Sequence, residues 1–391
     1  MHLTREEERI YDGELGWASQ ICMKILVKLG DLFGAERLIP IDSAHVSGVS
    51  YKTLGNAPIE FLKALAESGG KVRVESTLNP KSFDPEYLGG RLSEKLLQGQ
   101  REILQAFEKM GFKQSYTCTP YYLRKVKVGA HLAWAESSAV IYANSVLGAL
   151  TNREGGPSAL AAAIIGKTPE YGIHKPENRE PHVLVEVDPP IRYGIEYGAL
   201  GIFLGRILKD KIPVIKGLEK RNRDKLKQLG AALASTGMTN MFYYETDKLH
   251  MKAGLEKINV GRKEIENTIE ELTTTHTKPD IVFIGCPHCS LLEVRKIAEL
   301  ARGKKVKHGT ELWICTSQFI KEKAAAYISE LKRCGAKVLS DTCAVVTWTE
   351  ELGIKTIMTN SAKTAYYAPT LNKANTILAS LEECLKTALE K

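Results

Sequence analysis

The sequence lacks a hydrophobic run long enough to cross a membrane, and it lacks the apolar core of a secretion signal. A spanning helix needs about 18 or more apolar residues in succession, and no segment approaches that length. The first residues, MHLTREEERIYDGELG, are rich in charge instead. We therefore expect a cytoplasmic protein that does not contact a membrane.

Cysteines are scarce, and neither sign of charge dominates. Eight cysteines in 391 residues are too few for a disulfide scaffold, so we expect thiols, metal ligands or catalytic groups. Lys and Arg number 54 against 46 Asp and Glu, which gives a net charge of +8. The densest basic run, residues 216–227, is predicted to be a solvated helix face, because no aromatic residues accompany it as in a nucleic-acid site. The mild positive charge suits an anionic small-molecule substrate.

The length exceeds that of one typical core of about 100–200 residues, so two or three lobes are expected. In the last third, apolar runs such as residues 280–286 alternate with helical patterns such as residues 318–333 and a final helix over 374–390. This alternation predicts an α/β fold, with a parallel sheet covered by helices. We divide the chain into N-terminal α/β lobes over residues 1–275 and a C-terminal α/β lobe over residues 276–391.

The N-terminal part is less regular. Helical patterns, several of which end at glycine, alternate with shorter runs of β-branched residues. We predict helices over residues 56–70, 92–111 and 200–234, a strand over 71–77, and a linker over 245–280. No repeat or low-complexity tract is present.

Several polar residues share one position, the point where an apolar strand ends. Cys286, Cys343 and Ser361 each follow such a run, and Cys118 follows the short strand-like run QSYT. Sites in open α/β sheets form outside the carboxyl ends of the strands. By contrast, Cys315 lies inside a predicted strand, and two further cysteines lie near or within helices, so we expect these three to be structural: Cys315, Cys334 and Cys384.

Three chemical interpretations of the cysteines remain open from spacing alone. The segment GCPHCS places a CxxC at a helix start, as in a thiol–disulfide oxidoreductase, where the helix N-terminus lowers a thiol pKa. A zinc site is disfavoured because no second CxxC or CxxH pair follows at finger spacing. Alternatively, Cys118, Cys286 and Cys343 can hold an iron–sulfur cluster and leave one iron without a protein ligand. Such an open position is what a Lewis-acid catalyst needs.

Longer segments resemble one known family. These are SAHVSGVSYKTLG, ESTLNP, TCTPYY, WAESSAVIYANSVLGALTNREGG, IGCPHCSLLE, SDTC and TNSAKTAYYAP. They are similar to motifs of the aconitase X family and occur in family order over nearly the whole chain; the long central block is the most specific. The resemblance implies an aconitase-like multi-lobe fold, with parallel sheets flanked by helices.

The resemblance also implies a chemistry. The family dehydrates hydroxy acids; an archaeal branch acts on phosphomevalonate and a bacterial branch on cis-3-hydroxyproline. By resemblance, Cys118, Cys286 and Cys343 are ligands of a [4Fe-4S] cluster with one iron free of protein ligands, and Cys289 is not required. The retained cysteine triad favours the phosphomevalonate branch. An iron-dependent RNA-binding regulator, a role that some aconitase relatives have adopted, is disfavoured by the absence of a concentrated basic and aromatic surface.

Substrate-binding residues are expected in the matched motifs. Arg153 is the first choice for an anionic group because its planar fork binds carboxylate or phosphate with two hydrogen bonds, whereas Leu150 stands where the resemblance leads us to expect a second arginine. His45 and Glu136 are equally compatible with structural hydrogen bonding. The full expected set is His45, Ser47, Thr77, Asn79, Glu136, Asn144, Ser145, Asn152, Arg153, Glu154, Ser361 and Lys363.

Aconitases carry a mobile swivelling domain that closes over the cluster and supplies a catalytic serine base. No segment of this sequence matches that domain. We therefore expect a separate small subunit to carry it, and we assign no catalytic base to this chain.

Overall fold

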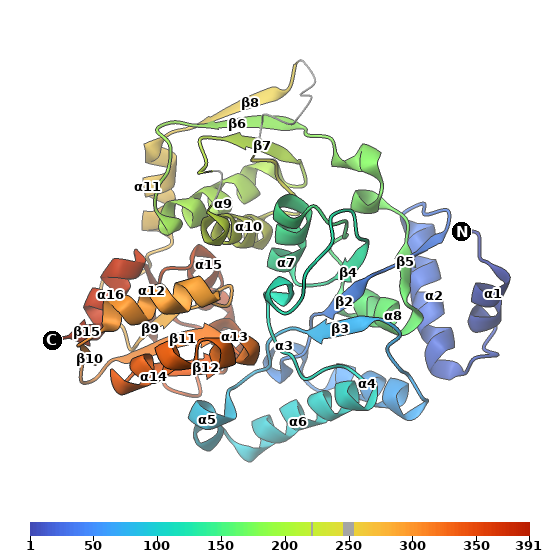
Figure 1. Ribbon diagram of the computed structural model, residues 1–391, viewed down its shortest axis with the longest axis horizontal. Helices are drawn as coiled ribbons and strands as arrows, with labels where there is room; N and C mark the ends of the chain where they lie inside the picture. The colour runs from blue at the N-terminus through green and yellow to red at the C-terminus, as the bar shows by residue number, and fades with distance from the viewer. Residues whose placement is uncertain (220–221, 245–253) are drawn as a thin grey trace. The chain divides into compact units, whose positions relative to one another are not determined.

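The computed structural model describes residues 1–219, 222–244 and 254–391. The chain divides into two compact units (Figure 1). The first unit comprises Met1–Ser82 and Ser93–Glu180, and the second comprises Phe83–Leu92 and Pro181–Lys391.

The first unit is built on a small parallel sheet. Its strands are β2 (Ser43–Val46), β3 (Glu75–Leu78) and β4 (Leu132–Trp134), with β2 in the centre. Helix α8 (Gly156–Ile165) packs on β2, and α2 (Trp17–Leu32) packs on α8. Every residue of α8 from its third position onward is buried, as expected for a helix that is apolar on all sides.

Shorter elements complete the first unit. They are α1 (Arg5–Tyr11), β1 (Leu38–Pro40), α3 (Tyr51–Leu54), α4 (Ala57–Glu67), α6 (Glu94–Lys109), η2 (Pro120–Tyr122), α7 (Ser137–Tyr142), η3 (Ala143–Leu147), β5 (Lys167–Pro169), η4 (Gly172–His174) and η5 (Pro176–Arg179).

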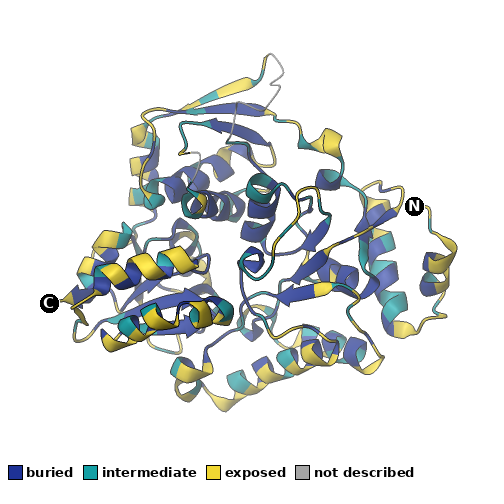
Figure 2. Ribbon diagram, viewed as in Figure 1, coloured by how far each residue is buried: buried dark blue, intermediate teal, exposed yellow. Residues whose placement is uncertain are grey.

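The second unit contains a five-stranded parallel sheet in the order β12-β11-β9-β13-β14. The strands are buried, while the helices around them expose one face to solvent (Figure 2). The strands are β9 (Ile281–Ile284), β11 (Glu311–Thr316), β12 (Lys337–Ser340), β13 (Thr356–Thr359) and β14 (Asn375–Leu378). The helices are α12 (Leu291–Ala301), α13 (Gln318–Lys323), α14 (Ala325–Arg333), α15 (Ala362–Leu371) and α16 (Leu381–Ala388).

The second unit also contains a three-stranded parallel sheet in the order β7-β6-β8. Its strands are β6 (Val183–Val187), β7 (Pro213–Lys216) and β8 (Glu256–Val260), and its helices are α9 (Gly194–Leu208), α10 (Arg223–Thr236) and α11 (Arg262–Glu271). Helices α9 and α10 pack closely because α9 presents glycine: a Cβ on Gly201 would lie 2.5 Å from the carbonyl oxygen of Leu229. The remaining elements of the unit are α5 (Pro85–Leu88), η1 (Gly89–Arg91), β10 (Lys305–Val306), η6 (Ala344–Val346) and β15 (Leu389–Glu390).

The predicted parallel sheet of the last third is confirmed, but three element boundaries were wrong. Residues 374–390 contain the edge strand β14 before helix α16, and residues 318–333 form the two helices α13 and α14. Residues 256–271 of the predicted linker form β8 and α11, whereas residues 245–253 lie outside the described residues. Strand β8 lies at a sheet edge and is largely exposed. Its sequence therefore lacks the alternation of apolar and polar residues by which a half-buried strand is predicted.

Four further predictions need correction. The helical interpretation of residues 200–234 overlooked β7, and the predicted strand over 71–77 is shorter, since β3 begins at Glu75. The run before Cys118 is not a strand but makes one isolated parallel bridge, between Leu78 and Tyr116. The basic run over 216–227 is not wholly a solvated face, because Lys227 is only 1% exposed.

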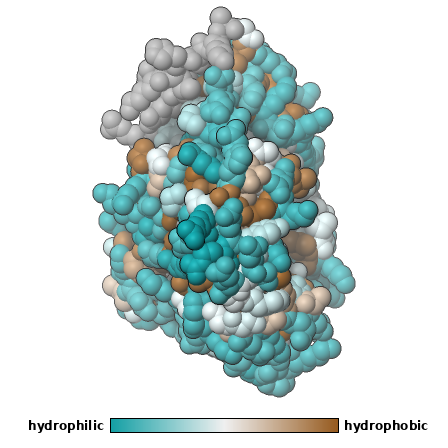
Figure 3. Space-filling model, turned by 90° about the vertical axis from the view of Figure 1, so that its right-hand side faces the viewer, coloured by the Kyte–Doolittle hydropathy of each residue, from teal (hydrophilic) through white to brown (hydrophobic). Residues whose placement is uncertain are grey.

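The face drawn in Figure 3 is mostly hydrophilic, with hydrophobic residues interspersed. None of the helices in the described parts of the chain combines the length and apolar character that a membrane crossing requires.

Candidate active site

Three of the predicted site residues lie where the sequence places them, just beyond the carboxyl ends of strands in the second unit. Cys286 follows β9, Cys343 follows β12 and Ser361 follows β13. Gly285, between β9 and Cys286, adopts a φ of +115°, and a Cβ there would lie 2.2 Å from the carbonyl oxygen of Cys315. Glycine is therefore required for the chain to turn against β11 at this point.

Cys286 and Cys343 are 4% and 7% exposed. Burial, followed by the neighbouring Cys286, raises the pKa of the Cys343 thiol to about 12, while the backbone of Val346 and Val345 and the Lys363 ammonium oppose the rise. The two thiols and Lys363 therefore lie near one another. Buried soft sulfur donors of this kind suit iron–sulfur and other thiophilic metal centres, whose positive charge favours the thiolate form.

The three cysteines predicted to be structural lie at the expected positions. Cys315 is inside β11, Cys334 is the residue after α14, and Cys384 is within α16. All three are buried, and burial is the first cause that raises each thiol pKa above its usual value. They are protonated at neutral pH and pack as small apolar groups.

Four other predicted residues meet in a hydrogen-bonded network of the first unit. The Nδ1 atom of His45 lies 2.7 Å from the Thr77 hydroxyl, and its Nε2 lies 3.3 Å from Asn79 Oδ1. The Asn79 amide donates to Glu136 Oε2 at 2.9 Å. The other carboxylate oxygen of Glu136 accepts from Ser138 and caps helix α7. The network joins the three strands of the small sheet, because its members follow or lie in β2, β3 and β4.

The chemistry of the network fixes the state of His45. Because Asn79 Oδ1 can only accept, Nε2 carries the hydrogen and Nδ1 accepts from Thr77. The side chain is completely buried, and this burial lowers the pKa of His45 to about 4. His45 is therefore neutral at physiological pH, and it orients Asn79 and Glu136 without itself being open to solvent.

Three more predicted residues shape the loop between η3 and α8. Asn144 exchanges two hydrogen bonds with the backbone of Thr151, at 2.9 and 3.0 Å. Asn152 donates to Tyr171 O and accepts from Ile173 N, at 3.0 and 2.9 Å. Their amides are thus engaged in holding the backbone.

Glu154 is buried and accepts from the Ser158 and Thr168 hydroxyls at 2.6 and 3.1 Å. Burial raises the pKa of Glu154. Its bonds tie the loop to α8 and β5, so we interpret it as a structural anchor of that loop.

The residues held by this loop are less buried. Arg153 forms a parallel bridge with Trp134 of β4 and is half-buried, as are Ser47 and Ser145. Gly156 brings the loop against Ser47, since a Cβ on Gly156 would lie 2.9 Å from the Ser47 carbonyl oxygen. Arg153 is therefore presented by a backbone that other predicted residues fix.

The predicted cysteine triad draws on both units. Cys118 belongs to the first unit and is 7% exposed, and it follows Thr117, whose backbone N–H donates to the Leu78 carbonyl at 2.8 Å. Cys286 and Cys343 belong to the second. Within either unit, the described residues include no group of three or more Cys, His, Asp or Glu side chains arranged to hold a metal ion.

Two residues near the Cys286 loop were missed by the sequence analysis. His288 is completely buried within the CPHC segment, and Lys227 of α10 contacts its backbone. The position of His288 between two cysteines was the feature of the sequence that could have marked it as a candidate site residue. Nothing in the sequence distinguished Lys227 from its solvated neighbours.

Comparison with known families covers most of the chain. Models described as the first, second and third domains of aconitase X match residues 1–177, 181–270 and 279–390.

Two curated relatives represent different activities. The chain is 47% identical to the "Phosphomevalonate dehydratase large subunit" of Methanocaldococcus jannaschii, with 99% of this chain and 100% of the relative covered. It is 34% identical to the "Cis-3-hydroxy-L-proline dehydratase" of Pseudomonas aeruginosa, with 98% of this chain but 69% of that relative covered.

The fold resembles a solved structure, the crystal structure of Thermococcus kodakaraensis aconitase X in its holo-form. The TM-score is 0.92 and the identity 42%, with 99% of this chain and 100% of the other covered.

Proposed function

This chain belongs to the aconitase X family, and from that premise we propose that it is the large subunit of a phosphomevalonate dehydratase. The enzyme would be an iron–sulfur-dependent hydro-lyase that converts (R)-5-phosphomevalonate to trans-anhydromevalonate 5-phosphate. The observation that carries the proposal is the full-length match at 47% identity to a relative so named, against 34% for the hydroxyproline enzyme.

The alternative activities are weaker. A cis-3-hydroxyproline dehydratase of the same family is the second candidate, and a substrate screen separates the two. A CPHC-type thiol–disulfide oxidoreductase is disfavoured because Cys286 and Cys289 are 4% and 2% exposed, whereas an attacking thiolate must reach its partner disulfide.

The aconitase-like family implies an iron–sulfur cluster. For this chain we propose a [4Fe-4S] cluster held by Cys118, Cys286 and Cys343, with one iron free of protein ligands. When bound, such a cluster supplies a Lewis-acid position that stabilises the charge on a departing hydroxide and on a neighbouring carboxylate. The burial of all three thiols and the strand-end position of two of them support this set.

The chain's own residues would bind and orient the substrate. We propose Arg153 and Lys363 for its anionic groups, with Asn79, Glu136, Ser47 and Ser145 as polar contacts. The other buried members of the set would hold these residues in place: His45, Thr77, Asn144, Asn152, Glu154 and Ser361. Loss of water also needs a base within hydrogen-bond reach of the acidic proton.

We propose that this base is supplied by a small partner subunit that carries a swivelling domain. Two facts support the proposal. The phosphomevalonate dehydratase relatives are named "large subunit", and the hydroxyproline dehydratases contain additional sequence, since this chain covers only 69% of them.

The cluster assignment is tested by serine substitution. After anaerobic reconstitution, Cys118→Ser, Cys286→Ser and Cys343→Ser should each lose the brown iron–sulfur absorption, bound sulfide and dehydratase activity. Four of the buried cysteines outside the triad serve as matched controls. These variants should keep iron and sulfide: Cys289→Ser, Cys315→Ser, Cys334→Ser and Cys384→Ser. Full iron and sulfide content in Cys343→Ser would contradict the assignment.

A further inference from the structure

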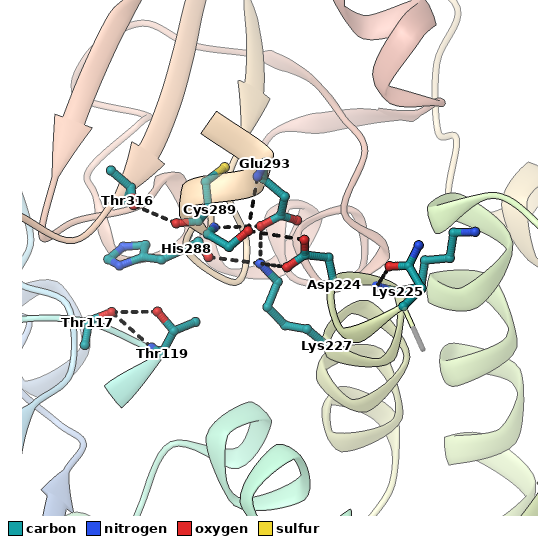
Figure 4. Close-up of polar contacts among 11 residues, drawn as sticks. Thr117, Thr119, Asp224, Lys225, Lys227, His288, Cys289, Glu293 and Thr316 are labelled. Carbon is teal, nitrogen blue, oxygen red and sulfur yellow. Dashed lines mark hydrogen bonds and ion pairs between the residues drawn. The ribbon is translucent and has the colours of Figure 1, made fainter. Parts of the chain in front are cut away.

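A buried lysine lies behind the segment that carries Cys286. Lys227, on α10, is 1% exposed. Its ammonium contacts Glu293 and the His288 carbonyl oxygen, the latter at 3.1 Å, and lies 3.9 Å from Asp224 Oδ1 (Figure 4). Burying an ammonium is unfavourable by several kcal/mol unless it is paired and hydrogen-bonded. Both carboxylates lie next to the Lys227 ammonium, and a further contact is directed at the cysteine loop.

The same carboxylates fix the start of helix α12, directly after the loop. Glu293 Oε2 accepts from the Ser290 backbone at 2.8 Å, and the Ser290 hydroxyl lies 3.2 Å from Asp224 Oδ2. One residue earlier, the backbone N–H of Cys289 donates to the Cys315 carbonyl at 3.0 Å, and the backbone carbonyl of Cys289 accepts from the Thr316 hydroxyl at 2.7 Å. Residues 288–290 are therefore attached on one side to α10 and on the other to β11.

His288 connects this loop to the second cysteine loop of the unit. Its side chain is completely buried, and Nε2 lies 2.9 Å from the Thr342 carbonyl oxygen. A carbonyl can only accept, so Nε2 must carry the hydrogen. Thr342 directly precedes Cys343. A continuous path of contacts thus runs from Lys227 through the His288 backbone and imidazole to the backbone that carries Cys343.

We propose that Lys227 and His288 are positioning residues for the iron–sulfur cluster, which fix the separation of Cys286 and Cys343. The inference rests on the proposed function, because it concerns two of the proposed ligands. Lys227 holds the backbone of the first cysteine loop, and His288 holds the second loop to it. The cluster then binds to ligands already in place, which lowers the ordering cost of binding.

The test uses cluster retention, a readout other than activity. Lys227→Met and His288→Leu are reconstituted anaerobically and then exposed to an iron chelator. Loss of outer partners of metal ligands typically costs about 10–100-fold in affinity. We expect iron release at least about tenfold faster than in the wild type, with an altered electron paramagnetic resonance spectrum. His288→Gln, which keeps a donor near the Nε2 position, should restore part of the retention.

The control is Lys225→Met, two residues away on α10, where the lysine pairs with Glu219 and is 21% exposed. It should release iron as the wild type does. Because Lys227→Met leaves two uncompensated carboxylates, the charge-balanced Lys227→Met/Glu293→Gln form is measured too; glutamine preserves the helix cap. If the two residues act through one path, the Lys227→Met/His288→Leu double variant should speed iron release by less than the product of the fold-changes of the two single variants.

Release rates and spectra equal to the wild type in His288→Leu and in the charge-balanced form would overturn the inference while leaving the cluster assignment intact. A wild-type chain that takes up no iron and sulfide would instead overturn the proposed function, and the positioning role with it.

Discussion

At the residue scale, the residues that we propose contact a substrate are, apart from the buried Glu136, more exposed than those that we propose hold them. His45, Asn144, Asn152 and Glu154 stand in family-like motifs, yet each is buried and engaged with neighbouring protein groups. Sequence identifies such residues as a set because their motifs are distinctive. It does not rank them, because a polar group next to a site and one that faces the substrate have the same side-chain chemistry.

Arg153 is the member of the set for which a substitution is most informative. If its guanidinium binds the substrate carboxylate or phosphate through two hydrogen bonds, Arg153→Lys keeps the charge but loses the fork. One charge-assisted hydrogen bond is worth roughly 1.5–3 kcal/mol, so we expect kcat/KM to fall about tenfold or more. The matched control is Arg37→Lys, on the surface of the same unit and paired with Glu170. An unchanged kcat/KM in Arg153→Lys would remove this residue from the site.

At the element scale, the sequence predicted best where hydrophobic pattern and burial coincide. The strands β9, β12 and β13 are short apolar runs, so the strand-end positions of Cys286, Cys343 and Ser361 could be predicted. The edge strand β8 could not be predicted, because it is largely exposed to solvent and begins with two charged residues. Lys227 shows the converse: this charged residue in a basic run is buried, and its contacts with Glu293 of α12 and with the cysteine loop cannot be predicted from local sequence.

The network that joins β2, β3 and β4 predicts a pH dependence. Burial lowers the pKa of His45 from 6.5 to about 4. Between these values the unfolded chain binds a proton that the folded chain does not, so stability falls as pH falls from about 6.5 toward 4. At pH 5 the loss relative to pH 7 is about 2 kcal/mol for this residue.

Urea unfolding of the wild type and His45→Gln at pH 7 and pH 5 measures this contribution. The variant should lose about 2 kcal/mol less on acidification. The pKa of His174 is also lowered, to about 3, but that residue is present in both proteins and cancels in the difference. Equal pH dependence in the two proteins would show that His45 is not held neutral by the network.

At the scale of the whole molecule, the proposed ligands are divided between the units, with Cys118 in the first and Cys286 and Cys343 in the second. The predicted division into residues 1–275, with substrate motifs, and 276–391, with two cluster cysteines, stays a prediction.

The proposed partner leads to a prediction for the complete enzyme. Dehydration requires a closed site from which water is excluded and a base that faces the bound substrate. No base is assigned to this chain, so the isolated, reconstituted chain should bind iron and sulfide but turn over phosphomevalonate negligibly. Adding a small subunit of about 100–150 residues, the size of one compact domain, should restore activity. It should also slow loss of the cluster in air, because the subunit would cover it.

The measurement is anaerobic turnover with and without the small subunit, on chain with the same iron and sulfide content. The control is the Cys343→Ser variant, taken through the same reconstitution and mixed with the small subunit. It should stay inactive. Substantial turnover by the loaded chain alone would mean that the base lies within these 391 residues. In that case Glu136 would be the first residue to test, because its carboxylate is already oriented by Asn79 and Ser138.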